Sequence, residues 1–458
     1  MTKKFLRRFL CAALSAATVF LAGTSTSADE RLEKKTIVEE RVAAEGVYKN
    51  WDGVSNVAQF LGANGEFCFA YDGEEYVTVV RTREGSTLKK KIKLKKPYPL
   101  FGTVTADAEG NYYLVTGRVN ETDDTSVNTV FISKFNKNGK LIKTVGDNGS
   151  SSLAYYYSND YRTKIPFDGG CCAAAINGDL LTVNYAREMY SGHQSNSVFT
   201  VRIDTMKAVD LGVWYNSHSF AQRAIPFGDG FVYVSEGDGY DRAFTTWAVH
   251  TKNNAATSTN EGNIFHFWVE KGTFDRWDMF TLNDNFAHMG GLAAVGDKVA
   301  LVATSAKSMN KNAEDENEQL FIQIFDPFKD LSKSGAYVTE GKRSGKSGKN
   351  GDESATDYGV KWLTNYKDQT IANPQVVATD DGKIVVLYEK TESYEYKGVY
   401  YIVLNEKGKV IQKAKRFSAD ARLNPCVMPV YSAKDGICWA ANAKSDTDHI
   451  YVYRLKLD

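Results

Sequence analysis

Residues 374–388 read Pro374-Gln-Val-Val-Ala-Thr-Asp-Asp-Gly382-Lys-Ile-Val-Val-Leu-Tyr388. Two short runs of apolar and β-branched residues flank an Asp-Asp-Gly turn, which is the pattern of a β-hairpin. A polar loop follows, then a third apolar run from Val399, an Asn-x-x-Gly turn that ends at Gly408, and a fourth run. The stretch therefore predicts four consecutive antiparallel strands.

The same plan recurs along the chain. A second clear copy reads Gly102-Thr-Val-Thr-Ala-Asp-Ala-Glu-Gly110-Asn-Tyr-Tyr-Leu-Val-Thr116, followed by a polar loop, a strand from Val130 and a turn that ends at Gly139. Weaker copies begin near residues 65, 172, 228, 291 and 428, which brings the count to seven. Because long segments with helical period are missing, the sequence predicts an all-β repeat protein.

Seven repeated meanders resemble the secreted β-propeller class, in which four-stranded blades surround a central channel. The resemblance covers residues 54–458 and implies a seven-bladed β-propeller of four-stranded antiparallel meanders, with ligands bound at the mouth of the channel. The repeats lack the Trp-Asp ending of WD40 blades and the regular Gly-Gly pair of kelch blades, so they indicate no named family. The alternative architecture is a pair of tandem β-sandwiches.

The N-terminus predicts export. Basic residues from Lys3 to Arg8 precede an apolar run and a small-residue stretch that ends at Ala28, which is the pattern of a signal peptide over residues 1–28. The apolar run is shorter than the roughly 20 residues that span a bilayer. We therefore expect cleavage and a secreted product, either extracellular or periplasmic, with no membrane span.

The last repeat stops at its third strand, Ile450–Leu457. The β-prone segment 35–42, within the N-terminal residues 29–53, is predicted to supply the missing strand and close the ring. Two hydrophilic segments, 307–319 and 329–360, are too polar to bury much apolar surface and are predicted to be flexible insertions in the propeller domain, residues 54–458.

Charge and cysteine content exclude several classes. With 56 basic and 56 acidic residues the chain has no basic field that would favour nucleic acid. The sequence holds no GxSxG, HExxH or EF-hand pattern, so it predicts no metal and no cofactor. Cys426 and Cys438 flank one predicted hairpin and are able to pair in an oxidising compartment, although the alternative, small buried thiols in strands, remains open. Adjacent Cys171 and Cys172 should face opposite sides of a strand.

Candidate site residues follow from the ring geometry. In a propeller, the residues just before each innermost strand converge around the channel. Here those positions are Asn56, Gly102, Asp168, His218, His288, Asn373 and Asn424. We predict that His218, His288, Asn373 and Asn424 bind a polar ligand there. Residues of these types also cap loop backbone groups, which is the competing interpretation.

The densest polar segment lies on either side of the predicted strand 230–235. Arg223 and Arg242 are candidates for holding an anionic group, and Asp238 or Asp241 with His218 for acid and base chemistry. Charges on neighbouring strands also pair with each other, so spacing does not choose between these roles.

The leading hypothesis is a secreted binding protein that recognises a polar ligand, a glycan or an extracellular protein partner at the loop-bearing face. The alternative is a propeller enzyme, a lyase or hydrolase of a carbohydrate or small polar substrate. A third hypothesis is a structural module of an extracellular assembly.

Overall fold

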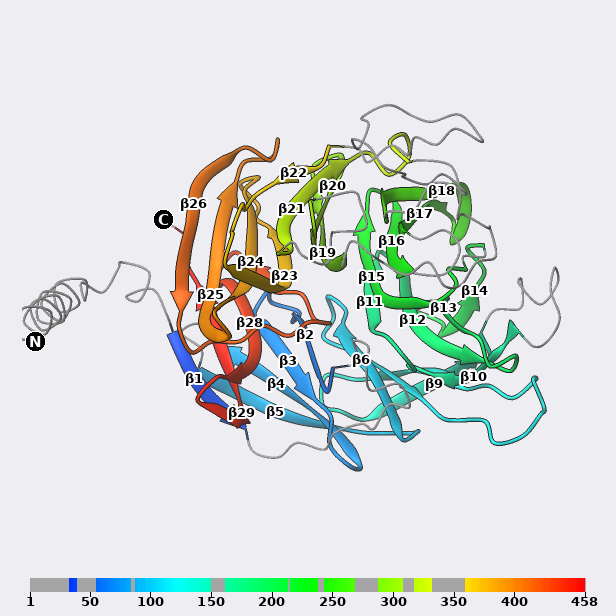
Figure 1. Cartoon of the computed structure of the whole chain (residues 1–458). Helices are drawn as coiled ribbons and strands as arrows, with labels where there is room; N and C mark the ends of the chain where they lie inside the picture. The colour runs from blue at the N-terminus through cyan, green and yellow to red at the C-terminus, as the bar shows by residue number, and fades with distance from the viewer. Residues whose placement is uncertain are drawn as a thin grey trace, which may run out of the picture.

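The computed structural model describes residues 33–38, 55–83, 87–149, 161–212, 215–237, 243–267, 287–307, 317–331 and 359–457. Within them the chain forms seven antiparallel sheets arranged around a common centre (Figure 1). This confirms the predicted all-β, seven-bladed propeller. The predicted signal peptide and most of the two predicted insertions lie outside the described residues.

Each sheet is one blade, numbered here in chain order from its innermost strand. Blades 1 to 3 consist of β2 (Val57–Leu61), β3 (Phe67–Tyr71), β4 (Tyr76–Arg83) and β5 (Thr87–Lys95); β6 (Leu100–Ala106), β7 (Tyr112–Gly117), β8 (Val130–Phe135) and β9 (Leu141–Asp147); and β10 (Thr163–Pro166), β11 (Cys172–Asn177), β12 (Leu180–Met189), β13 (Gln194–Arg202) and β14 (Lys207–Val209). Blade 3 thus carries one strand more than the repeat predicts, because both β10 and β11 pair with β12.

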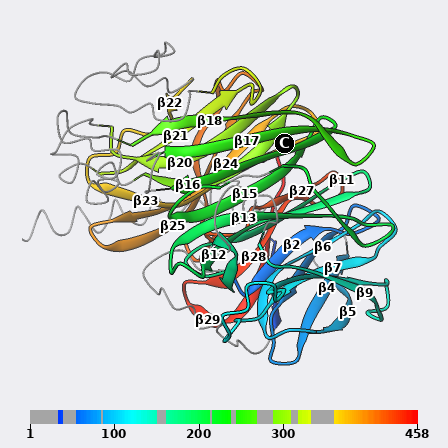
Figure 2. The same ribbon diagram turned by 90° about the vertical axis from the view of Figure 1, so that its right-hand side faces the viewer.

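Blades 4 to 7 follow the same plan. They consist of β15 (Ser219–Phe227), β16 (Gly230–Gly237), β17 (Ala243–Lys252) and β18 (Ala255–His266); β19 (His288–Val295), β20 (Lys298–Ser305), β21 (Gln319–Phe325) and β22 (Lys361–Trp362); β23 (Gln369–Ala378), β24 (Ile384–Glu392), β25 (Glu395–Leu404) and β26 (Val410–Ser418); and β27 (Val430–Ser432), β28 (Gly436–Ala443), β29 (Asp446–Leu455) and β1 (Glu33–Val38). Figure 2 turns the ring by 90° and shows the strands of blade 4 side by side.

The core consists of seven hydrophobic clusters, and each lies between two neighbouring blades. The cluster between blades 4 and 5, for example, includes Val234, Phe265 and Phe321, all fully buried. Since side chains alternate along a strand, a blade packed on both faces needs apolar residues at successive positions. This requirement explains runs such as β7, in which every residue is buried.

The ring closes between blades 7 and 1. Strand β1 pairs antiparallel with β29, from Glu33 opposite Arg454 to Val38 opposite Ile450, and so completes the four strands of blade 7. Val57 of blade 1 and Val452 of blade 7 belong to the cluster between these two blades. The innermost strands remain short sheet edges, but they face the centre of the ring, and this protection limits edge-to-edge aggregation.

No helix in the described part of the chain is long and apolar enough to cross a bilayer.

Candidate binding face

The face on which the innermost strands begin is called here the loop-bearing face. His218 directly precedes β15 and His288 is the first residue of β19, so both histidines lie on this face in adjacent blades. Asn373 lies in the first half of β23, and Asn424 precedes β27. Asp238, Asp241 and Arg242 lie outside the described residues.

His218 packs against a second histidine, His193, at a tilted angle of 36° between the two ring planes. His193 comes from the turn between β12 and β13, and the two ring centroids are 4.7 Å apart. The backbone N–H of His218 donates to the carbonyl of Gln194 at 2.9 Å, which fixes the start of blade 4 against blade 3. Its φ of 48° is left-handed, an uncommon conformation for a residue other than glycine. This cross-blade contact and the bridge between Ser195 and Ser217 bring the two imidazoles together.

His193 is held in its neutral form. Its Nε2 lies 2.7 Å from Ser217 Oγ. Burial, and secondarily the nearby His218, lower the pKa of His193 below its ordinary value. An uncharged imidazole offers one donor and one acceptor, so His193 is suited to hydrogen bonding with polar groups at neutral pH.

His288 interacts with the carboxyl groups of Glu236 and Glu318. Its side chain is 63% exposed, and its Nδ1 is 3.8 Å from Glu236 Oε1. Glu236 has a structural role as well, since its Oε2 accepts the N–H of Met289 at 2.7 Å and so joins blade 4 to blade 5. Burial raises the pKa of Glu318, and the charge of His288 opposes that rise.

Arg223 is a buried centre of contacts between blades. Its side chain donates to three main-chain carbonyls: Nε to Gly290 at 2.6 Å, Nη1 to Gln222 at 2.9 Å and Nη2 to Pro425 at 3.0 Å. The residue is only 3% exposed. These bonds join blade 4 to blade 5 and to the segment before blade 7. Most of the guanidinium is therefore engaged by the protein itself, as expected of a residue that joins the blades.

The two predicted asparagines also contact the protein. The Asn424 side chain donates through Nδ2 to Ser55 Oγ at 2.5 Å and accepts the N–H of Cys426 through Oδ1 at 3.2 Å. Asn373 has a φ of 50° and hydrogen-bonds Glu389, whose Oε1 accepts the N–H of Leu423 at 2.7 Å. Both asparagines thus organise the segments that lead into inner strands, as the capping interpretation predicts.

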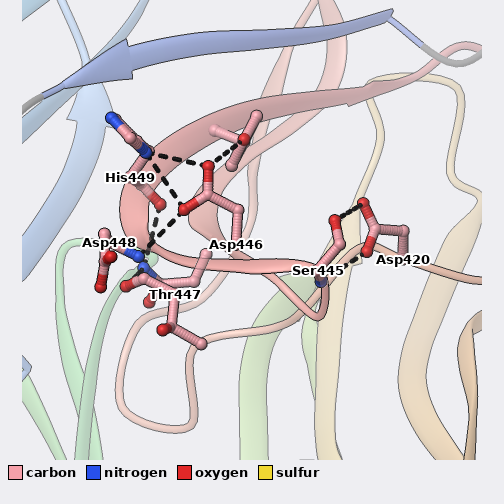
Figure 3. Close-up of polar contacts among 8 residues, drawn as sticks. Asp420, Ser445, Asp446, Thr447, Asp448 and His449 are labelled. Atoms are coloured by element: carbon pink, nitrogen blue, oxygen red, sulfur yellow. Dashed lines mark hydrogen bonds and ion pairs between the residues drawn. The ribbon is translucent and has the colours of Figure 1, made fainter.

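A polar turn on the same face of blade 7 is satisfied internally (Figure 3). The Asp446 carboxylate accepts His449 Nδ1 at 2.9 Å and the Tyr451 hydroxyl at 2.5 Å. The hydrogen bonds from Tyr451 and His449 lower the pKa of Asp446 to about 2. Ser445 donates to Asp420 through its N–H at 2.8 Å and its hydroxyl at 2.9 Å. The hydrogen-bonding groups of this turn therefore serve the structure of the loop itself.

The centre of the ring contains a cavity of about 350 Å³. Each of the seven blades contributes to its wall, and most of the lining side chains are small or aliphatic, such as Ala173, Leu292 and Val376. The polar side chains in the lining are those of Gln59, Thr103, Thr105 and Arg223. The cavity is thus poorly suited to a strongly polar ligand, and the polar side chains gather instead on the loop-bearing rim.

No group of three or more His, Cys, Asp or Glu residues within the described ranges is placed to hold a metal ion.

The predicted pairing of Cys426 with Cys438 is not what the structure shows. Cys426 Sγ lies 2.7 Å from Cys171 Sγ, whereas Cys438 is buried in β28 between blades 7 and 1. Nearness in sequence does not bring the two thiols together, because strand β28 directs Cys438 into the core. Cys172 belongs to the cluster between blades 2 and 3, whereas Cys171, directly before β11, belongs to the cluster between blades 4 and 5, so the two neighbours pack in different clusters.

Comparison with known proteins gives a fold likeness only. No protein-family model matches the chain, and no curated protein matches it. Among solved structures, an α-L-arabinanase from Cellvibrio cellulosa in complex with arabinohexaose is 11% identical, with a TM-score of 0.32 over 68% of this chain and 93% of that one. The Hadza microbial sialidase Hz136 is 10% identical, with a TM-score of 0.38 over 80% and 66%.

Prolyl oligopeptidase B from Galerina marginata is 10% identical, with a TM-score of 0.41 over 99% of this chain and 52% of that chain. At such low identities and TM-scores these three likenesses do not indicate what this chain binds or does.

Proposed function

We propose that this chain is an exported binding protein that recognises a polar ligand on the loop-bearing face of blades 3 to 5. The observation that supports the proposal is the close pair of His193 and His218, whose ring centroids are 4.7 Å apart on that face. Exposed His288, at the start of the next blade, extends the same polar rim. A glycan or a polar surface of an extracellular protein partner fits these contacts.

The chemistry of recognition is hydrogen bonding by the imidazole rings of His193 and His218. His193 shares its Nε2 with Ser217, and both rings of the pair are only partly buried. Tyr161 and Tyr215, whose rings meet edge to face at 6.0 Å, lie in segments that lead into blades 3 and 4 and add aromatic surface. Aromatic and polar groups side by side are the usual composition of a surface that binds an amphipathic ligand such as a sugar.

Binding should depend on the histidine pair. We expect His218→Ala and His193→Ala each to weaken binding to a glycan found on an array by roughly tenfold, since a lost hydrogen bond costs about 1–1.5 kcal/mol. His250→Ala is the matched control, because His250 pairs with Asp229 at the opposite face. Affinities measured by calorimetry that are equal for all three variants would contradict the proposal.

The pH dependence has a definite sign. Since the pKa of His193 lies below its ordinary value of 6.5, its ring stays neutral at pH 7, and affinity should fall only on acidification below that ordinary value. The folded state binds this proton at a lower pH than the unfolded chain does. The free energy of unfolding should therefore decline as the pH falls below the ordinary histidine value of 6.5.

One observation favours the second candidate, a hydrolase or lyase of a carbohydrate or small polar substrate. Glu318 has a raised pKa and lies near the exposed His288, and a carboxyl group with a raised pKa beside an imidazole suits acid and base chemistry. Product detection across a glycan panel, with Glu318→Gln as the test variant, distinguishes turnover from binding. Turnover that Glu318→Gln abolishes would establish the enzyme.

Export is part of the proposal and rests on the N-terminal sequence pattern. When the gene is expressed in a secreting host, mass spectrometry of the exported fraction should find a chain that begins near Asp29. An exported or cell-associated mature protein that retains residues 1–28 would exclude this processing.

A further inference from the structure

Two cysteines from opposite parts of the ring meet beside the central cavity. Cys171 directly precedes β11, the inner strand of blade 3, and Cys426 lies shortly before β27, the inner strand of blade 7. Their Sγ atoms are 2.7 Å apart, although the residues are 255 positions apart in the chain. Blades 3 and 7 are not neighbours in the ring. The contact therefore crosses the ring at the end where the inner strands begin.

The surrounding hydrogen bonds hold both cysteines in place. The N–H of Cys171 donates to Gln222 Oε1 at 2.7 Å, and the N–H of Cys426 donates to Asn424 Oδ1 at 3.2 Å. Arg223 contacts the segments of both cysteines, since its Nη2 donates to the carbonyl of Pro425 at 3.0 Å and its Nη1 lies 3.6 Å from Cys171 Sγ. The two sulfurs are thus positioned by the same residues that join blades 3, 4 and 7.

The electrostatic environment favours oxidation of this pair. A guanidinium next to a thiol stabilises the thiolate, which is the form that reacts in thiol–disulfide exchange. Cys171 is fully buried and Cys426 is partly exposed, so an oxidant reaches the pair through Cys426. The other described cysteines differ: Cys68, Cys172 and Cys438 are buried, and burial raises the pKa of the Cys172 thiol well above its ordinary value.

We propose that Cys171 and Cys426 form a disulfide that ties blade 3 to blade 7 across the loop-bearing end of the cavity. A covalent S–S bond is about 2.05 Å long, so a small side-chain adjustment converts the contact into the bond. The disulfide is independent of ligand binding on the rim.

The oxidant is an external disulfide, which belongs to a thiol oxidoreductase or to a small molecule in the compartment outside the cytosol. The Cys426 thiolate attacks that disulfide and forms a mixed disulfide, and one sulfur of the oxidant leaves as a thiol. The Cys171 thiolate then attacks Cys426 Sγ and displaces the second sulfur as a thiol. The two cysteines lose two protons and two electrons, and the oxidant gains both.

A peptide map of the wild-type mature protein tests the bond without relying on any variant. Protein exported to an oxidising compartment is denatured, alkylated without reductant, digested and analysed by mass spectrometry. We expect one peptide pair linked through Cys426, with Cys68 and Cys438 alkylated. Repeating the map on Cys172→Ser assigns the partner to Cys171 rather than to its neighbour. Full alkylation of Cys171 and Cys426, or a link to Cys172 or Cys438, overturns the proposal.

Thermal melting with and without reductant gives an independent readout. Because the bond closes a very long loop of chain, reduction should lower the melting temperature of the wild type by roughly 5 °C. Cys438→Ala, the matched control, should remain sensitive to reductant, whereas Cys171→Ser and Cys426→Ser should lose that sensitivity. If Cys171→Ser does not fold, the partly exposed Cys426 still provides the comparison. A wild-type melting temperature that reductant does not change contradicts the bond.

Discussion

Replacing Asp435 by Ala is expected to lower the free energy of unfolding by about 3–5 kcal/mol. Asp435 lies in the turn between β27 and β28, and its Oδ1 is 2.9 Å from Arg454 Nη2, with both side chains only 1% exposed. Its Oδ2 also accepts the N–H of Phe67 from blade 1 at 3.4 Å. The substitution leaves the Arg454 cation buried without this carboxylate at the junction that closes the ring.

The cost arises because the buried Arg454 cation loses this carboxylate, rather than from a large gain in the pair itself. A variant that combines Asp435→Ala with Arg454→Met should therefore recover a large part of the lost stability. Asp204→Ala is the control, because the ion pair of Asp204 with Arg202 is exposed and should contribute little to stability. Urea and thermal midpoints of the four proteins measure the difference. Equal midpoints for Asp435→Ala and the wild type would show that closure does not depend on this pair.

Replacing Arg223 by Ala is expected to have a comparable effect, about 3–5 kcal/mol, because several charge-assisted hydrogen bonds of roughly 1.5–3 kcal/mol each are lost and buried carbonyls are left without donors. The three carbonyls belong to Gln222, Gly290 and Pro425, which come from three different parts of the ring. Lysine has a single ammonium in place of the planar fork, so Arg223→Lys should restore only part of the stability.

Two measurements separate this structural role from ligand binding. Melting temperature should fall for Arg223→Ala, whereas Arg202→Ala, a change at an exposed arginine, should leave it nearly unchanged. If Arg223→Ala instead melts like the wild type and only loses ligand affinity, Arg223 belongs to the binding surface, as the sequence alone suggested.

The fold was predictable because its signal is local. The hairpin predicted for residues 374–388 appears as β23 and β24 around the Asp-Asp-Gly turn, and Gly382 has the positive φ of 78° that such a turn requires. Repetition of that hairpin then predicts the ring, since only a closed array of meanders buries both faces of each sheet. Extra strand β10 was missed because its four residues carry no alternating pattern.

The site was less predictable because its contacts are between blades. The ring geometry correctly placed His218 and His288 on one face. No local sequence pattern connects His218 to His193, because their contact depends on how the segment before β15 crosses to blade 3. Arg223 illustrates the same limit. Its sequence context fits an anion-binding residue, and only the positions of Gly290 and Pro425 show that its donors join the blades.

The most direct measurement of the central proposal is histidine footprinting of the ligand-bound protein. All six histidines of the chain lie within the described residues. Mature protein is treated with diethyl pyrocarbonate, with and without a saturating glycan found on the array, and modification is quantified by mass spectrometry. His449, on the same face in blade 7, and His250, near the opposite face, are internal references, with side chains 45% and 36% exposed. The proposal predicts that the glycan protects His193, His218 and His288 and leaves these references unchanged. The proposal would be contradicted if the bound glycan protected only His449 or His250. It would also be contradicted if the glycan protected none of His193, His218 and His288.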